Sequence, residues 1–148
     1  FLAGGTSGAG ALPDVEWFSP DGEHIDWYAA DGSLCCFFGA PDRETLLVEP
    51  DAAAGGISGV ARHVLIMAHA GSEPRTFRFP NSAPLRKLAW RVFVDTGRAP
   101  PDDIHVAGAG PAVDTDRPWE RLDRSLLVLV ADAAAPQPPG RVAVPKPA

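Results

Sequence analysis

Short apolar runs separated by proline and glycine set the strongest limit on how this chain can fold. The sequence has 148 residues, among them 16 prolines and 15 glycines, and these divide its apolar segments into short pieces. Proline and glycine favour turns, and apolar runs of about four to eight residues between turns are typical of strands. Because no long amphipathic helix is visible between the turns, the pattern predicts an all-β protein.

The spacing of these runs predicts about seven to eight short strands in an antiparallel β-sandwich with Greek-key-like order. Residues 33–39, 63–70 and 125–131 are predicted as buried central strands, and residues 75–80 and 87–96 alternate between apolar and polar positions. Residues 15–18, 45–48 and 104–106 are shorter candidates. In residues 87–96, alternation places Leu88, Trp90, Val92 and Val94 on the core face.

A Pro-Asp-Gly turn lies between two tryptophans, Trp17 and Trp27. Pro20 presets its own φ, Asp21 can hydrogen-bond nearby backbone, and Gly22 accepts a positive φ, so the strand at residues 15–18 should reverse sharply here. Tryptophan suits a domain interface as well as it suits a ligand platform, and the turn alone does not choose between them.

Length and charge narrow the class of protein. A chain of this size, 45% hydrophobic, can bury one core, so one domain is expected. The net charge is −6 and the basic residues are scattered singly, which argues against a nucleic-acid partner. No apolar run approaches the roughly 18 residues of a membrane helix, and residues 1–11 do not read as a signal peptide. We therefore expect no membrane partner.

The two cysteines, Cys35 and Cys36, are adjacent in the sequence. On a strand they point to opposite faces, so a bridge between them would be strained. We interpret them as buried thiols in a reducing compartment, and the cytoplasm fits best.

No catalytic, metal or cofactor site is predicted. His63 and His69 would share a strand face, but no other ligand stands at a suitable spacing, so both are interpreted as structural. Ser58 lacks the sequence of a nucleophile elbow, and the paired carboxylates fall in Pro-rich loops. Aromatic side chains remain as binding candidates. Trp90 is assigned to the core, and the exposed candidates for a domain interface or a sugar platform are Trp17, Trp27, Tyr28 and Trp119.

Six segments in order resemble the C-terminal domain of bacterial glycogen debranching enzymes of the isoamylase type, in the α-amylase superfamily. The matching segments are Phe-Leu-Ala-Gly at 1–4, Asp-Val-Glu-Trp-Phe-Ser-Pro-Asp-Gly at 14–22 with Asp-Trp at 26–27, Met-Ala-His-Ala at 67–70, Phe-Arg-Phe-Pro at 77–80, Trp to Thr at 90–96, and Arg-Ser-Leu at 124–126. The chain departs from the family pattern in a shorter stretch between Trp17 and Trp27, in Leu-Cys-Cys-Phe-Phe at 34–38, and in Met67 where the family has asparagine.

The resemblance implies a non-catalytic domain. In that family the catalytic acids lie on a preceding barrel, and the parent enzyme hydrolyses α-1,6 branch linkages of glycogen or limit dextrin. Residues 1–13 would then be the remnant of the junction with the barrel, residues 14–132 the β-sandwich that caps and stabilises it, and residues 133–148 a Pro-rich mobile tail. Near the junction, apolar area for the interface with the barrel would come from Phe1, Leu2, Trp17 and Phe18.

Two other classes of function stay open. A carbohydrate-binding module for α-glucans would line one concave face with exposed aromatics. An immunoglobulin-like interaction domain would instead present a large apolar patch to another protein.

Overall fold

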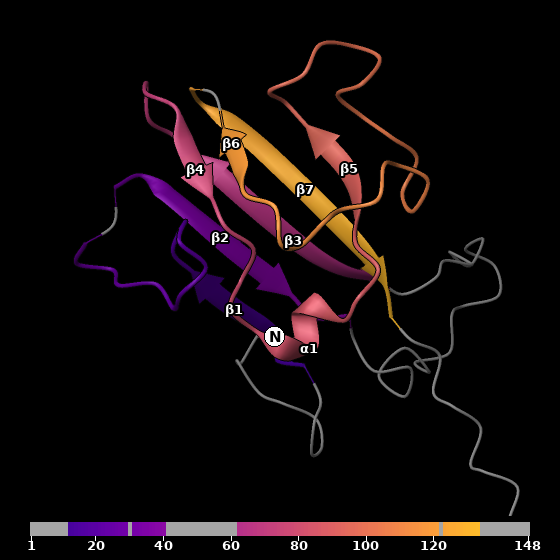
Figure 1. Cartoon of the computed structure of the whole chain (residues 1–148), viewed down its shortest axis with the longest axis horizontal. Coiled ribbons are helices and arrows are strands. Elements are labelled where there is room, and N and C mark those ends of the chain that lie inside the picture. Colours follow the sequence, from indigo (N-terminus) through magenta and orange to yellow (C-terminus); the bar gives the residue numbers. More distant parts are fainter. Residues whose placement is uncertain (1–11, 30, 41–61, 122, 134–148) are drawn as a thin grey trace, which may run out of the picture.

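The computed structural model of this protein describes residues 12–29, 31–40, 62–121 and 123–133 (Figure 1). These residues form seven antiparallel strands and one short helix, so the predicted all-β class is confirmed. The predicted strand at residues 45–48 lies outside the described residues. So do residues 1–11 of the predicted junction and residues 134–148 of the predicted tail.

The strands form a five-stranded sheet and a two-stranded sheet. In the larger sheet the order is β1-β2-β3-β7-β5, and the smaller sheet pairs β4 with β6. The element bounds are β1 Val15–Phe18, β2 Ser33–Phe38, β3 Arg62–His69, β4 Arg75–Phe77, α1 Ala83–Arg86, β5 Arg91–Asp95, β6 Trp119–Arg121 and β7 Ser125–Asp132. Within the described residues the sheets do not close on each other, and the Greek-key sandwich stays a prediction.

The three longest strands lie close to their predicted positions and form the middle of the larger sheet. In β3 every second residue is buried, which is the alternation expected of a strand with one covered face. Leu65 pairs with Phe37 of β2 on one side and with Leu129 of β7 on the other, so all three side chains project from the same face. We call this buried face the inner face and the opposite one the outer face.

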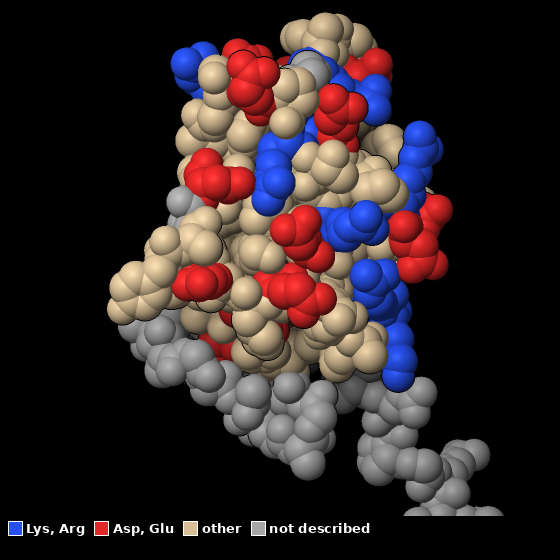
Figure 2. Space-filling view, turned by 60° about the vertical axis from the view of Figure 1, so that its left-hand side comes forward, with Lys and Arg blue, Asp and Glu red and all other residues tan. Residues whose placement is uncertain are grey.

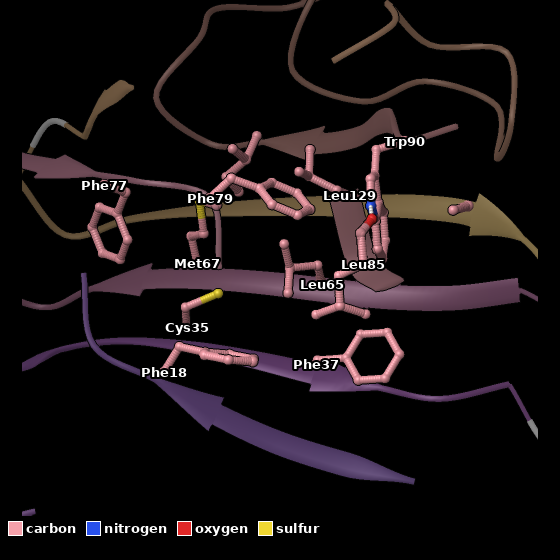
Figure 3. Packing of buried hydrophobic residues seen from close by; sticks show 12 residues of the cluster. Phe18, Cys35, Phe37, Leu65, Met67, Phe77, Phe79, Leu85, Trp90 and Leu129 are labelled. Carbon is pink, nitrogen blue, oxygen red and sulfur yellow. Dashed lines mark hydrogen bonds between the residues drawn. The ribbon is translucent and has the colours of Figure 1, made fainter. Parts of the chain in front are cut away.

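The core lies between the inner face and the chain segment that runs from β4 to β5. Figure 3 shows Phe77, Phe79, Leu85 and Trp90 of this segment meeting the inner-face side chains of β2 and β3. The indole Nε1 of Trp90 donates a hydrogen bond to the carbonyl oxygen of Leu85 at 2.8 Å, which satisfies its polar atom inside the core. Trp90 is therefore a core residue, as predicted.

The predicted strand at residues 87–96 is wrong in two respects. The strand begins only at Arg91, because the chain before it forms α1, with a proline in its first turn, and then bends. The register also shifts between Val92, which pairs with Leu129, and Val94, which pairs with Val128. Since Leu129 and Val128 project from opposite faces, Val94 lies on the outer face and not on the core face.

Two other predicted strands are shorter in the structure than the sequence pattern indicated. The strand predicted at residues 75–80 ends at Phe77, although Phe77 and Phe79 are both buried as expected. At residues 104–106 the chain makes only an isolated bridge between Ile104 and Val94. Conversely, β6 and α1 were not predicted from the sequence.

The Pro-Asp-Gly turn reverses the chain after β1, as predicted. Phe18 and His24 form a bridge across it, the amide of Ser19 donates to the carbonyl oxygen of Glu23 at 2.7 Å, and Gly22 has a φ of +84°. The carbonyl oxygen of Gly22 also accepts a hydrogen bond from the amide of Asn81 at 2.7 Å. The turn is therefore fixed against the segment that follows β4.

Candidate functional site

Three of the aromatic candidates lie in and just after β1. Trp17 is 37% exposed, Trp27 is 59% exposed and Tyr28 is fully exposed. The rings of Trp17 and Trp27 meet edge to face, with centroids 5.5 Å apart and an angle of 64° between the planes. The turn thus brings the two tryptophans into one exposed aromatic pair.

The other two candidates lie elsewhere. Phe18 is only 2% exposed and belongs to the core, because it faces Cys35 and Met67 on the inner face, so its ring is not accessible to a partner. Trp119 is half-buried in β6, with its ring centroid 6.3 Å from that of Phe79. The five predicted residues therefore do not form one site.

The outer face of the five-stranded sheet is almost entirely apolar. The pairing register sets Trp17, Cys36, Ile66, Val128 and Val94 in one row that crosses all five strands. Apart from Arg91, the neighbouring rows are apolar too, and none of the outer-face residues belongs to the core cluster. The apolar members of this face are Val15, Trp17, Leu34, Cys36, Phe38, Val64, Ile66, Ala68, Val94, Leu126, Val128 and Val130.

Charged strand residues on the outer face gather at one end. Arg62 donates to the carboxylate of Asp132 at 2.8 Å, and Arg91 stands on the adjacent row, opposite Val130. Elsewhere on the surface the charges are mixed, and Figure 2 shows Lys and Arg interspersed with Asp and Glu. An antiparallel sheet with one solvated face normally alternates polar with apolar residues, so the apolar outer face is a candidate interaction surface.

His63 and His69 share the inner face, as their spacing predicts, and each is used structurally. Nδ1 of His69 lies 2.9 Å from Oγ of Ser33, and its Nε2 lies 2.6 Å from the carbonyl oxygen of Glu73. Nδ1 of His63 accepts a hydrogen bond from the amide of Ala40 at 3.0 Å, and burial lowers the pKa of this imidazole. These contacts occupy ring nitrogens that a metal or a proton transfer would need.

The two cysteines point to opposite faces of β2 and are both free and buried, as predicted. Burial raises the pKa of the Cys36 thiol to about 11. Burial, together with the nearby Cys36, also raises the pKa of Cys35. Neither thiol is poised as a nucleophile or as a metal ligand.

Sequence reasoning missed one polar cluster, which lies where β5 approaches β6. Arg121 Nη1 lies 2.6 Å from Oδ1 of Asp95, and both side chains are buried. A hollow of about 580 Å³ opens beside this pair, and Trp119 is among its lining residues. The strand β6 is only three residues long, which is too short to stand out as an apolar pattern in the sequence. Trp119 was therefore the one residue of this cluster that the sequence marked as a candidate.

Within the four described stretches, no group of three or more His, Cys, Asp or Glu side chains could hold a metal ion. No helix in the described part of the chain is long and apolar enough to cross a membrane. A comparison with models of known protein families finds no match, and no curated protein matches the chain either.

Proposed function

We propose that this chain is a non-catalytic accessory domain that packs against a catalytic domain through its outer face. The observation that carries the proposal is the row from Trp17 to Val94, an apolar band that crosses all five strands. Scattered apolar side chains are normal on a surface, but a continuous band of them is typical of a docking site.

The size of the outer face suits an interface between domains. Five strands about 4.8 Å apart and about six residues long at 3.3 Å each span roughly 500 Å². This area is an upper limit on what docking can bury, because the outer-face residues Cys36 and Val130 are only 2% and 5% exposed. Doubled for two partners it is about 1,000 Å², within the range of roughly 600 to 1,500 Å² for such interfaces. The exposed pair of Trp17 and Trp27 at the β1 edge would extend this area.

The ordered resemblance of six segments suggests which enzyme the domain serves. We assign it as the C-terminal domain of an isoamylase-type glycogen debranching enzyme, whose preceding barrel hydrolyses α-1,6 branch linkages. The chain would then cap and stabilise that barrel without taking part in the reaction. Buried free thiols at Cys35 and Cys36 suit a cytoplasmic protein, where such groups stay reduced.

The gene provides the first test. The reading frame upstream of Phe1 should encode a barrel with a nucleophilic aspartate, an acid/base glutamate and a second aspartate. An unrelated upstream sequence would refute the family assignment but leave the docking face to be tested separately.

The docking face is tested in the full-length polypeptide with Ile66→Asp, which places a charge in the centre of the outer face. The thermal midpoint of the catalytic domain should fall, and a protease should separate the two domains more readily. Thr76→Asp is the matched control, because Thr76 is exposed on β4 of the smaller sheet. Equal behaviour of the two variants would show that the outer face does not dock.

A further inference from the structure

A second surface of the molecule has the features of a ligand site and lies on the opposite side of the larger sheet. We call it the β5–β6 hollow. Its volume is about 580 Å³, within the roughly 300 to 1,000 Å³ of small-molecule sites. Its lining residues are Val92, Asp95, Arg98, Asp102, His105, Pro111, Ala112, Val113, Asp114, Arg117, Pro118, Trp119, Glu120, Arg121 and Leu127.

Backbone hydrogen bonds hold the outer wall of the hollow in place. The chain between β5 and β6 bonds along the free edge of β5: the amide of His105 donates to Phe93 at 2.9 Å, and the amide of Asp95 donates to Asp103 at 2.8 Å. Gly110 packs so tightly on β5 that a Cβ atom there would overlap the carbonyl oxygen of Val92. The wall is therefore fixed before any ligand arrives, which reduces the entropy that binding must overcome.

Apolar side chains contribute to the inner side of the hollow. Val92, Val113 and Trp119 pack against the core cluster, and Leu127 belongs to it. The indole of Trp119 is half-buried, and its contact with Phe79 fixes its position. A rigid aromatic ring at the edge of a polar hollow offers a flat apolar surface to a ligand.

Polar groups of both signs surround this apolar surface. Arg98, Arg117 and Arg121 face a lining that also contains four carboxylates. Within the described stretches, the side chains of Asp102 and Arg117 make no hydrogen bond or ion pair, so both are available to a ligand. The four lining carboxylates are Asp95, Asp102, Asp114 and Glu120.

The charged groups of the lining bear on the ligand class. Asp95 is already paired with Arg98 and Arg121, so Arg117 and the carboxylates of Asp102, Asp114 and Glu120 remain to meet a ligand. These three carboxylates disfavour an anionic ligand, because it would meet like charges. A neutral ligand with many hydroxyl groups can donate to the carboxylates and accept from the guanidinium group. If one of its faces is apolar, that face can also lie on the indole ring.

The geometry points to a neutral pyranose unit of an oligosaccharide as the ligand of the β5–β6 hollow, with Trp119 as the stacking platform and Asp102 and Arg117 as hydroxyl partners. This site is formed on the inner side of the sheet and does not depend on the outer face. A negative result for docking at the outer face would therefore not count against the sugar site. A negative result for the sugar site would likewise not count against docking.

The test is a titration of the ¹⁵N-labelled 148-residue chain with maltoheptaose, with cellohexaose and with inorganic phosphate, followed by NMR. We expect one of the two sugars to shift the indole signal of Trp119 with a millimolar dissociation constant, and phosphate to leave it unchanged. The indole signal of Trp119 is identified by its loss in Trp119→Phe.

Two variants and one control locate the site. Trp119→Phe should weaken sugar binding about threefold, because part of the aromatic surface is lost. Arg117→Ala, at an exposed position outside the core, should weaken it as well. Trp27→Phe is the control and should bind as the unchanged chain does. No response to either sugar, a response to phosphate alone, or a loss of binding in Trp27→Phe only would each overturn the proposal.

Discussion

Arg121 of β6 donates a 2.6 Å hydrogen bond to the carboxylate of Asp95 in β5, so one buried ion pair joins the two sheets. The same carboxylate accepts from the amide of Gly97 at 3.1 Å and lies 3.4 Å from Nε of Arg98. A buried pair of this kind adds little over an apolar pair of the same shape, but removing one partner leaves the other charge buried alone.

The first prediction follows from this ion pair. Asp95→Asn should lower the free energy of unfolding by about 3 kcal/mol, because the guanidinium of Arg121 stays buried without its counter-charge. Urea unfolding measures the change. Asp116→Asn is the control, since the Asp116 side chain is 90% exposed in its pair with Arg86. The control should lose no more than about 1 kcal/mol. Equal losses in both variants would contradict the prediction.

The second prediction concerns the turn after β1. Gly22 has a φ of +84°, and a Cβ atom there would lie 2.6 Å from the carbonyl oxygen of Phe79. Gly22→Ala should therefore destabilise the fold by about 3 kcal/mol, from backbone strain and displacement of the turn together.

Gly32→Ala separates these two contributions. Gly32 has a φ of +79°, but the nearest atom to its Cβ would be 3.9 Å away. Gly32→Ala should lower the free energy of unfolding by only about 1 to 2 kcal/mol, from backbone strain alone. If thermal unfolding showed the same loss of stability for Gly22→Ala and Gly32→Ala, the close contact of the turn with Phe79 would contribute nothing to the stability of the fold.

The third prediction compares neighbours on β3. Leu65 is fully buried on the inner face, and Ile66 is half-buried on the outer face. Leu65→Ala should lower the free energy of unfolding by about 3 kcal/mol, from lost burial and the cavity left behind. Ile66→Ala should lower it by about 1 kcal/mol in the chain without a partner. A reversed order would mean that the inner face had been assigned wrongly.

The fourth prediction concerns pH. Burial lowers the pKa of His63 below its usual 6.5, so the unfolded chain binds more protons than the folded chain as the pH falls below that value. The contribution of neutral His63 is therefore complete above pH 6.5 and is lost as the pH falls through the lowered pKa of the folded state. Protonation at Nδ1 would also remove the acceptor for the amide of Ala40.

Urea unfolding between pH 7 and pH 5 measures this loss, in a range chosen above the usual pKa of carboxylates. In His63→Gln the decline should become shallower, because this titrating group is gone. A decline of unchanged slope in the variant would show that other groups produce it.

Local sequence pattern predicted some elements of the fold well and others poorly. The turn at Gly22 and the strands β2, β3 and β7 were predicted closely, because positive φ and unbroken apolar runs are local properties. The extent of β5 was not, since α1 precedes it and a register shift lies inside it.

Residue order alone predicts the all-β class, the positions of the central strands, and the sharing of one face by alternate residues on them. The folded arrangement is needed to place β7 between β3 and β5, to point Phe18 toward the core and Trp17 away from it, and to bring Arg121 to Asp95. Strand alternation follows from neighbouring residues, so a local pattern predicts it. Which face becomes covered, and which charges meet, depends on segments that are far apart in the chain and come together only in the folded state.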